Sequence, residues 1–214
     1  MAATLSYPFE GRPEPATVKE VAPGILWLRM PLPFALNHIN LWALVDEGGW
    51  TLVDTGIADD TTRGLWDQLF SGPLAGRNVV RLICTHFHPD HAGLAGWLTD
   101  RFGVELWMTR AEWLQARVLK QDTGPGMLDQ QVEFYEKAGA PAEYLDGVRA
   151  AGPSYAKRVG EIPRAYRRIR ENEEIRIGGR TWRIVIGLGH APEHACLYCP
   201  EEKLLIAGDM VLPR

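Results

Sequence analysis

The segment that most constrains this 214-residue chain is a short apolar run at residues 79–84, which leads directly into a stretch rich in histidine. The run, VVRLIC, is typical of a β-strand buried on both faces, as strands are in a parallel sheet covered by helices. Predicted strands and helices alternate through the first half of the chain, an order typical of a layered α/β sheet. We therefore expect an α/β fold in which the histidines follow an inner strand.

The remaining elements follow from hydrophobic spacing and turn residues. Residues 47–49 predict the turn of a β-hairpin, because glycine is present and strand-forming residues lie on both sides. Residues 110–168 have a mostly helical pattern, and we expect a helical insertion that lies over the sheet. The predicted strands are residues 24–30, 40–45, 50–54, 79–84, 104–108, 174–177, 181–186, 195–199 and 204–206, and the predicted helices are residues 60–70, 94–98, 111–121, 127–138 and 142–159.

Composition and charge narrow the class of protein. Hydrophobic residues make up 46% and charged residues 23% of the chain, which is ordinary for a globular protein, and the length suits one core. We divide the chain into an irregular lead-in at residues 1–17 and one domain at residues 18–214. The net charge of −4 gives no reason to expect nucleic acid or a membrane as a partner. We expect a cytoplasmic protein, because no signal peptide or membrane span is recognisable and three cysteines suit a reducing compartment.

Residues 85–91, THFHPDH, carry the strongest signal for chemistry. Imidazole nitrogen and carboxylate oxygen are good zinc ligands, and so many within a few residues are costly to pack unless they bind something. If the segment stays extended, His86, His88 and Asp90 face one cavity, because strand residues two apart point to the same side. His91 then approaches from the start of a helix. A histidine-rich loop without a metal is the alternative.

Two further candidate ligands follow later strands. His190 lies in the sequence GLGH, and Asp209 lies in AGD after the last predicted strand. Taken alone, each is as easily explained as a capping or surface residue. Together with the cluster at residues 85–91, they indicate further ligands of one metal site.

These motifs resemble those of the metallo-β-lactamase superfamily and occur in the same order. The match runs from about residue 21 to the C-terminus and includes VDTG at residues 53–56, the cluster at 85–91, and Gly-His and Gly-Asp at 189–190 and 208–209. The resemblance implies an αββα sandwich. It also implies roles for individual residues. His86, His88 and His190 would bind one metal, Asp90 and His91 would bind a second, and Asp209 would bridge the two. Asp54 would support a ligand imidazole, and His194 would stabilise a loop.

The resemblance also implies that a part of the fold is missing. Members of the family carry a further histidine on a later strand, whereas none of the six histidines here follows Asp209. We therefore expect a fold that is incomplete at the C-terminus, as in a fragment or a short form, with a second metal site one ligand short and less fully occupied. An apolar face without its covering layer would favour a homo-oligomer.

The function implied by the resemblance is metal-dependent hydrolysis of a small molecule. Up to two zinc ions would activate a hydroxide, although such mixed sites also accept iron or manganese. Asp90 and Asp209 are the candidate catalytic carboxylates that orient the nucleophile or handle its proton. A bridging Asp209 resembles glyoxalase II-like and lactonase-like hydrolases, so an ester or thioester is the expected substrate. The alternatives are an inactive, truncated metal-binding relative, and a lactonase, phosphodiesterase or nuclease of the same fold.

Three other features have a structural and a functional interpretation. His38, between two predicted strands, is a candidate substrate contact, with a structural histidine as the alternative. Cys196 and Cys199 form a C-x-x-C, but strand residues three apart point to opposite faces, so we expect a structural role. The basic run at residues 164–170 is either a solvated surface or a contact for an anionic substrate.

Overall fold

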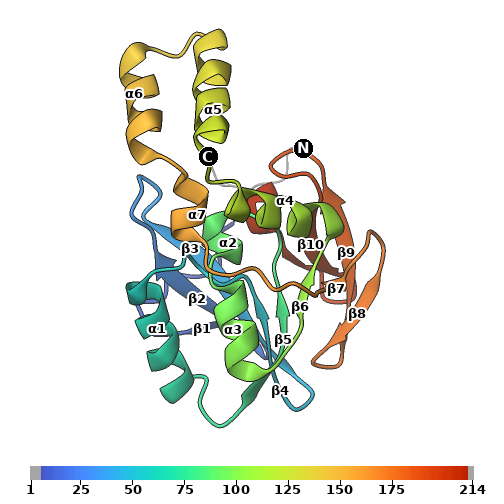
Figure 1. Ribbon diagram of the computed structural model, residues 1–214. Helices are drawn as coiled ribbons and strands as arrows, with labels where there is room; N and C mark the ends of the chain where they lie inside the picture. Colours follow the sequence, from blue (N-terminus) through green and yellow to red (C-terminus); the bar gives the residue numbers. More distant parts are fainter. Residues whose placement is uncertain (1–5, 212–214) are drawn as a thin grey trace.

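Two β-sheets packed face to face, with helices over the outer face of the first, form the centre of the molecule (Figure 1). The computed structural model describes residues 6–211. The first sheet holds β1 to β7 in chain order, and the second holds its strands in the order β11-β10-β9-β8. The predicted α/β fold class is confirmed.

Most elements coincide with those predicted from the sequence. The first sheet consists of β1 (Lys19–Ala22), β2 (Ile25–Pro31), β3 (His38–Asp46), β4 (Gly49–Val53), β5 (Asn78–Ile83), β6 (Leu106–Met108) and β7 (Arg167–Arg168). The second consists of β8 (Glu174–Ile177), β9 (Arg180–Gly187), β10 (His194–Cys199) and β11 (Leu204–Ile206). The helices are α1 (Asp60–Ser71), α2 (Pro89–Ala92), α3 (Ala95–Phe102), α4 (Arg110–Gln121), α5 (Pro125–Lys137), α6 (Ala142–Ala151) and α7 (Ser154–Arg158).

The strand that precedes the histidines is an inner strand with both faces covered. β5 pairs in parallel with β4 on one side and with β6 on the other. Its Leu82 belongs to the core under the helices, where Trp66 and Leu98 also lie, whereas Ile83 belongs to the core between the sheets, opposite Trp182. This double burial explains the nearly continuous apolar run at residues 79–84.

The helical region differs from the prediction at two points. The predicted helix at residues 142–159 is two helices, α6 and α7, because the chain turns at Gly152, with a φ of 62°, and Pro153 follows. The first sheet also resumes earlier than predicted, since β7 pairs with β6 at Arg167 and Arg168, within the range expected to be an insertion. The short length of β7 left no periodic signal to find.

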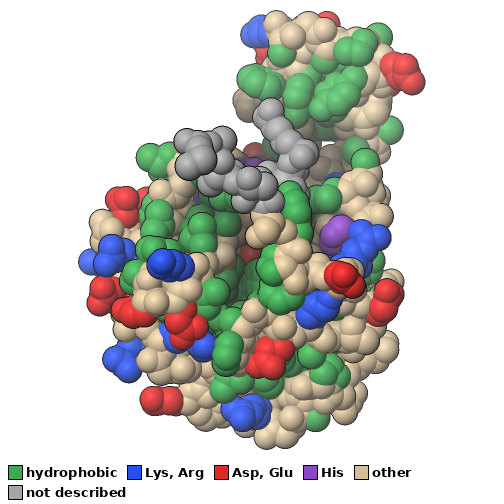
Figure 2. Space-filling model, turned by 180° about the vertical axis from the view of Figure 1, so that it is seen from behind, with side chains coloured by type: hydrophobic (Ala, Val, Ile, Leu, Met, Phe, Trp, Pro, Cys, Tyr) green, Lys and Arg blue, Asp and Glu red, His purple; other side chains and the backbone are tan. Residues whose placement is uncertain are grey.

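The helices after β6 divide into a packed pair and a projecting pair. α4 and α7 contact each other, and a small core that includes Ala116 and Val159 joins them to the body. α5 and α6 pack on each other and stand away from the sheets as a hairpin (Figure 1), on which hydrophobic side chains gather (Figure 2). Phe134 and Tyr144 are exposed there. Within residues 6–211, no helix combines the length and apolar character needed to cross a bilayer.

Candidate metal centre

The candidate ligands lie beyond the ends of strands from both sheets, on loops and in the short helices that follow the strands. A hydrogen bond from the Thr85 N–H to Asp54 Oδ1 (2.7 Å) joins the loops after β4 and β5, and one from the Ala195 N–H to the Thr85 carbonyl (2.9 Å) joins the second sheet to them. The positions are Asp54 after β4, His86 and His88 after β5, Asp90 and His91 in α2, His190 after β9 and Asp209 in a 3₁₀ turn (Gly208–Met210) after β11.

The ligand-rich segment does not stay extended, so that part of the prediction is wrong. The chain bends after His88, and α2 begins at Pro89, where a helix tolerates the missing N–H of proline. Asp90 therefore does not continue the strand face of His86 and His88. Its Oδ2 lies instead 3.6 Å from His91 Nε2, one residue along the same short helix.

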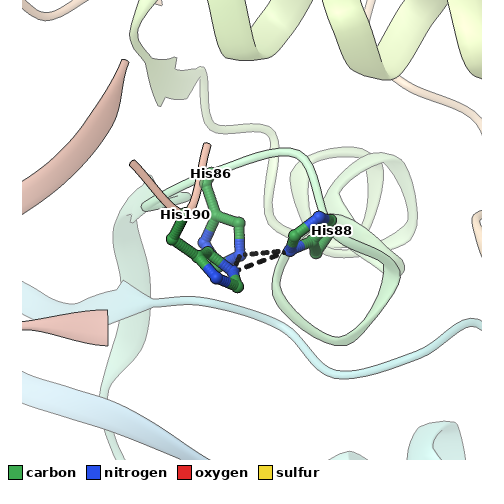
Figure 3. Close-up of side chains that lie close together, drawn as sticks. All are labelled: His86, His88 and His190. Carbon is green, nitrogen blue, oxygen red and sulfur yellow. Dashed lines mark hydrogen bonds between the residues drawn. The ribbon is translucent and has the colours of Figure 1, made fainter. Parts of the chain in front are cut away.

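Three histidines point their ring nitrogens at one another (Figure 3). The separations are 2.9 Å between His86 Nε2 and His88 Nδ1, 2.9 Å between His88 Nδ1 and His190 Nε2, and 3.1 Å between His190 Nε2 and His86 Nε2. Nitrogen ligands of a tetrahedral zinc, each about 2.0–2.1 Å from the metal, lie about 3.3 Å apart. The three imidazoles therefore fit a zinc-like ion with little rearrangement.

The environment keeps two of these imidazoles neutral. Burial, and then the neighbouring His91, lower the pKa of His86, and burial followed by His190 lowers the pKa of His88 to about 4. A neutral imidazole is the form that binds a metal. Because the folded-state pKa of His88 lies below the unfolded value of about 6.5, its effect is to destabilise the metal-free fold as the pH falls from 6.5 towards 4.

A second group of possible ligands adjoins the first. His86, His91 and Asp209 present ligand atoms within 4.8 Å of one another, and Asp209 Oδ1 lies 3.3 Å from His91 Nε2. His91 is buried, and among residues 6–211 its Nε2 has no hydrogen-bond partner. A buried ring nitrogen without a partner is costly in a folded protein, and a metal ion would satisfy it. Asp209 Oδ2 also lies 3.3 Å from His190 Nε2, so this carboxylate reaches both groups.

Asp54 fixes the orientation of the His91 ring through its Nδ1. It is buried, with a φ of 67°, and accepts hydrogen bonds from the Thr85 N–H and hydroxyl. Its Oδ2 lies 2.8 Å from His91 Nδ1, which turns Nε2 towards Asp209. The neighbouring Gly56 has a φ of 83°, and a Cβ there would lie 2.7 Å from the Thr62 side chain, so the Asp-Thr-Gly motif requires glycine at its end.

The contacts of Asp54 also set the charge on His91. Burial alone would lower the pKa of His91, but the carboxylates of Asp54, Asp209 and Asp90 raise it to about 10. In the metal-free protein His91 is therefore an imidazolium at neutral pH. Its contribution to stability is fully present below the unfolded pKa of about 6.5 and is lost as the pH rises through 10.

The other two histidines differ in their contacts. His194 contacts candidate ligands, whereas His38 contacts its neighbour Asn37. His194 is buried at the start of β10, stacks on His86 with ring centroids 4.6 Å apart, and accepts a hydrogen bond from the Asp209 N–H (3.1 Å). His38 is the first residue of β3 rather than part of a loop, and its Nδ1 lies 2.6 Å from Asn37 Oδ1. Contact between His38 and a substrate stays a prediction.

Sequence reasoning missed polar residues that hold the site together. The Thr85 hydroxyl lies 3.0 Å from His86 Nδ1, and Glu112 and Tyr155 make hydrogen bonds to the loops that carry the three histidines. Glu112 and Tyr155 lie on helices whose hydrophobic spacing is ordinary, so only the folded arrangement reveals their contacts. The two cysteines of the C-x-x-C are both buried and free, as a structural role requires.

Comparison with known proteins identifies the family. Residues 36–214 match the model of the metallo-beta-lactamase superfamily, and the chain belongs to that superfamily. A crystal structure of a beta-lactamase domain protein from Burkholderia ambifaria superposes with a TM-score of 0.83 at 42% identity, covering 97% of this chain and 60% of that one. A metallo-beta-lactamase family protein from Thermus thermophilus gives a TM-score of 0.76 at 26% identity, covering 91% of this chain and 62% of that one.

Curated relatives are more distant and longer. The probable metallo-hydrolase YqjP of Bacillus subtilis is 25% identical over 88% of this chain and 57% of its own length. The human acyl-coenzyme A thioesterase MBLAC2 is 26% identical over 90% of this chain and 65% of its own length. This chain thus spans less than two thirds of the length of these relatives.

The charge on His91 leads to a prediction about zinc binding. His91 must lose its proton to become a ligand, so loading metal-free protein with zinc at pH 7 should release more protons from the wild type than from Asp54→Asn. The variant removes the largest influence that raises the pKa of His91, and asparagine tolerates a left-handed φ. The measurement is the binding enthalpy in buffers with different ionisation enthalpies. Equal proton release from both proteins would contradict a charged His91.

Proposed function

We propose that this protein is a metal-dependent hydrolase of thioesters or related esters, with zinc as its metal. The observation that carries the proposal is the convergence of three imidazole nitrogens beside the buried His91, whose Nε2 lies 3.3 Å from Asp209 Oδ1. In this assignment the first metal is held by His86, His88 and His190, and the second by His91, Asp209 and Asp90.

The bound metal would supply a nucleophile at neutral pH and would polarise the substrate carbonyl. The carboxylates beside it have distinct tasks. Asp209 reaches both ligand groups, and its pKa is lowered because His91, followed by His190, outweighs the effect of burial, so it remains an anion. Burial raises the pKa of Asp90 in the metal-free protein. As a ligand of the second metal, this carboxylate would orient the nucleophile. Asp54 and His194 orient His91 and the Asp209 loop.

Two observations favour a thioester over other substrates. The human relative is named as an acyl-coenzyme A thioesterase. A depression of about 490 Å³ opens beside His190, and its lining includes the apolar side chains of Phe87, Leu188 and Pro192. Such a surface suits an acyl group next to the reacting carbonyl.

The Cys84 and Cys196 thiols are poor nucleophiles, which favours attack from the metal site. Cys84 and Cys196 are buried, and burial raises the pKa of both thiols. A thiol rather than a thiolate is weakly nucleophilic. Hydrolysis by this protein should therefore require the metal throughout.

The test is a substrate panel assayed with a metal-free and a zinc-loaded protein. Acyl-coenzyme A thioesters of short and medium chain length, a lactone, a p-nitrophenyl ester and bis(p-nitrophenyl) phosphate cover the alternatives. We expect thioester hydrolysis that a chelator abolishes and zinc restores. Zinc binding without turnover of any compound would favour a non-catalytic relative, and turnover of the phosphodiester alone would replace the thioester proposal.

A further inference from the structure

The backbone of Phe87, which lies between His86 and His88, is held on both sides by side chains from the helical segment. The Phe87 N–H donates to Glu112 Oε2 at 2.9 Å, and the Phe87 carbonyl accepts a hydrogen bond from the Tyr155 hydroxyl at 2.7 Å. Glu112 lies in the first turn of α4, and Tyr155 lies in α7. These two hydrogen bonds fix the two peptide groups that join His86, Phe87 and His88, and so help to set where the two imidazoles lie.

The second oxygen of Glu112 reaches the loop that carries the third histidine. Its Oε1 accepts a hydrogen bond from the Glu193 N–H at 2.6 Å, three residues after His190. Glu193 in turn binds the start of the helix that carries Glu112. Its Oε2 accepts a hydrogen bond from the Ala111 N–H at 2.8 Å, and its carbonyl accepts one from the Thr109 hydroxyl at 2.8 Å. One carboxylate therefore bridges the two loops that supply all three imidazoles.

Burial makes the contacts of Glu112 costly to lose. Glu112 has no exposed surface, and a buried carboxylate without its hydrogen bonds is strongly unfavourable. Burial also raises the pKa of the Tyr155 phenol, so its hydroxyl stays protonated and remains a donor. Neither side chain is a candidate metal ligand, because each is occupied by the backbone of the ligand loops.

We propose that Glu112 and Tyr155 are positioning residues of the three-histidine metal site, which they act on through the Phe87 peptide and, for Glu112, through the His190 loop. The inference rests on the proposed metal site. It makes the helical segment after β6 a part of the metal centre. The spacing of His86, His88 and His190 depends on α4 and α7 as well as on the sheets.

The test compares Glu112→Gln and Tyr155→Phe with the wild type. Glutamine keeps the volume of Glu112 but has only one acceptor oxygen, so one of the two N–H groups would face an amide NH₂. We expect zinc affinity, measured by chelator competition, to fall about 10–100-fold in Glu112→Gln, as is usual when a residue that supports a ligand is changed. Tyr155→Phe loses one hydrogen bond and should fall about 5-fold.

Two further measurements and a pair of control variants separate positioning from general stability. The visible spectrum of the cobalt-substituted protein reports ligand geometry and should change in both variants. The unfolding temperature of the metal-free protein should change little in Tyr155→Phe, because this variant removes a single hydroxyl. If Glu112→Gln does not fold, Tyr155→Phe alone tests the positioning role. The exposed Glu143 and Tyr7 supply matched controls, Glu143→Gln and Tyr7→Phe, which should match the wild type.

Each outcome bears on a distinct claim. If both variants kept the zinc affinity and the cobalt spectrum of the wild type, the positioning role would be overturned. A lower unfolding temperature with unchanged zinc affinity would overturn it as well. Failure of the wild type itself to bind zinc would overturn the proposed metal site, and the positioning role with it, before any variant is compared.

Discussion

His86→Ala should lose most of its metal and lower kcat/KM for a thioester at least about 10³-fold, since a bound metal contributes several kcal/mol to such reactions. His86 is the one residue whose ring belongs to both ligand groups, and it is fully buried. Its removal leaves the first group with His88 and His190 and the second with His91 and Asp209. Elemental analysis and steady-state kinetics on the same preparation measure both effects.

A ligand effect must be separated from a packing effect in this variant. Truncation of a buried imidazole leaves a cavity, which by itself destabilises the fold. Free imidazole can enter the vacated space and should restore part of the metal content and rate if the loss is one of coordination. Full metal content in His86→Ala, or a loss that imidazole leaves unchanged while the metal-free protein is unfolded, would contradict the assignment of His86 as a ligand.

The order of elements and the family were predictable from the sequence, because both depend on local patterns. The apolar run at residues 79–84 marks an inner strand, and the histidines that follow it have few explanations other than a metal. His190 and Asp209 were predictable only together with the cluster at residues 85–91 and through the resemblance, since a single polar residue after a strand is common. The structure brings His190 to within 2.9 Å of His88 across 102 residues of sequence.

What the sequence did not predict depends on local backbone geometry or on distant contacts. The bend at Pro89 moves Asp90 out of the strand face, and spacing alone does not distinguish an extended segment from a short helix. The contacts of Glu112 with the Phe87 and Glu193 N–H groups span 25 and 81 residues. A glutamate in the first turn of a helix is usually exposed, so nothing in the amino-acid order marks Glu112 as buried.

The residues of the second ligand group differ from those that the resemblance implied. The resemblance assigned Asp90, His91 and Asp209 to it, one ligand short of the family pattern. In the structure the second group with ligand atoms within 4.8 Å of one another is His86, His91 and Asp209, while Asp90 Oδ2 lies 3.6 Å from His91 Nε2. A second metal here would share His86 with the first group, and Asp209 Oδ2 also lies 3.3 Å from His190 Nε2, so retention of the second metal should depend on this carboxylate.

Asp209→Asn should therefore lose the more weakly held metal and lower kcat/KM about 10²–10³-fold, while His86, His88 and His190 retain one ion. The substitution keeps the volume of the side chain, but it removes the charge that lies 3.3 Å from both His91 Nε2 and His190 Nε2. An amide oxygen is a poorer ligand for zinc than a carboxylate, and it no longer offsets two metal charges. Zinc content after dialysis at graded free zinc, together with the cobalt spectrum, measures the loss.

The matched control for this variant is Asp60→Asn, because Asp60 is a fully exposed carboxylate on α1 whose ion pair is with Arg63. It should keep the wild-type metal content and rate. If Asp209→Asn also keeps them, Asp209 does not join the two groups, and the contact between the Asp209 N–H and His194 would then serve only to fold the loop after β11. A selective loss of one ion would instead mean that this short 3₁₀ turn decides whether the site holds one metal or two.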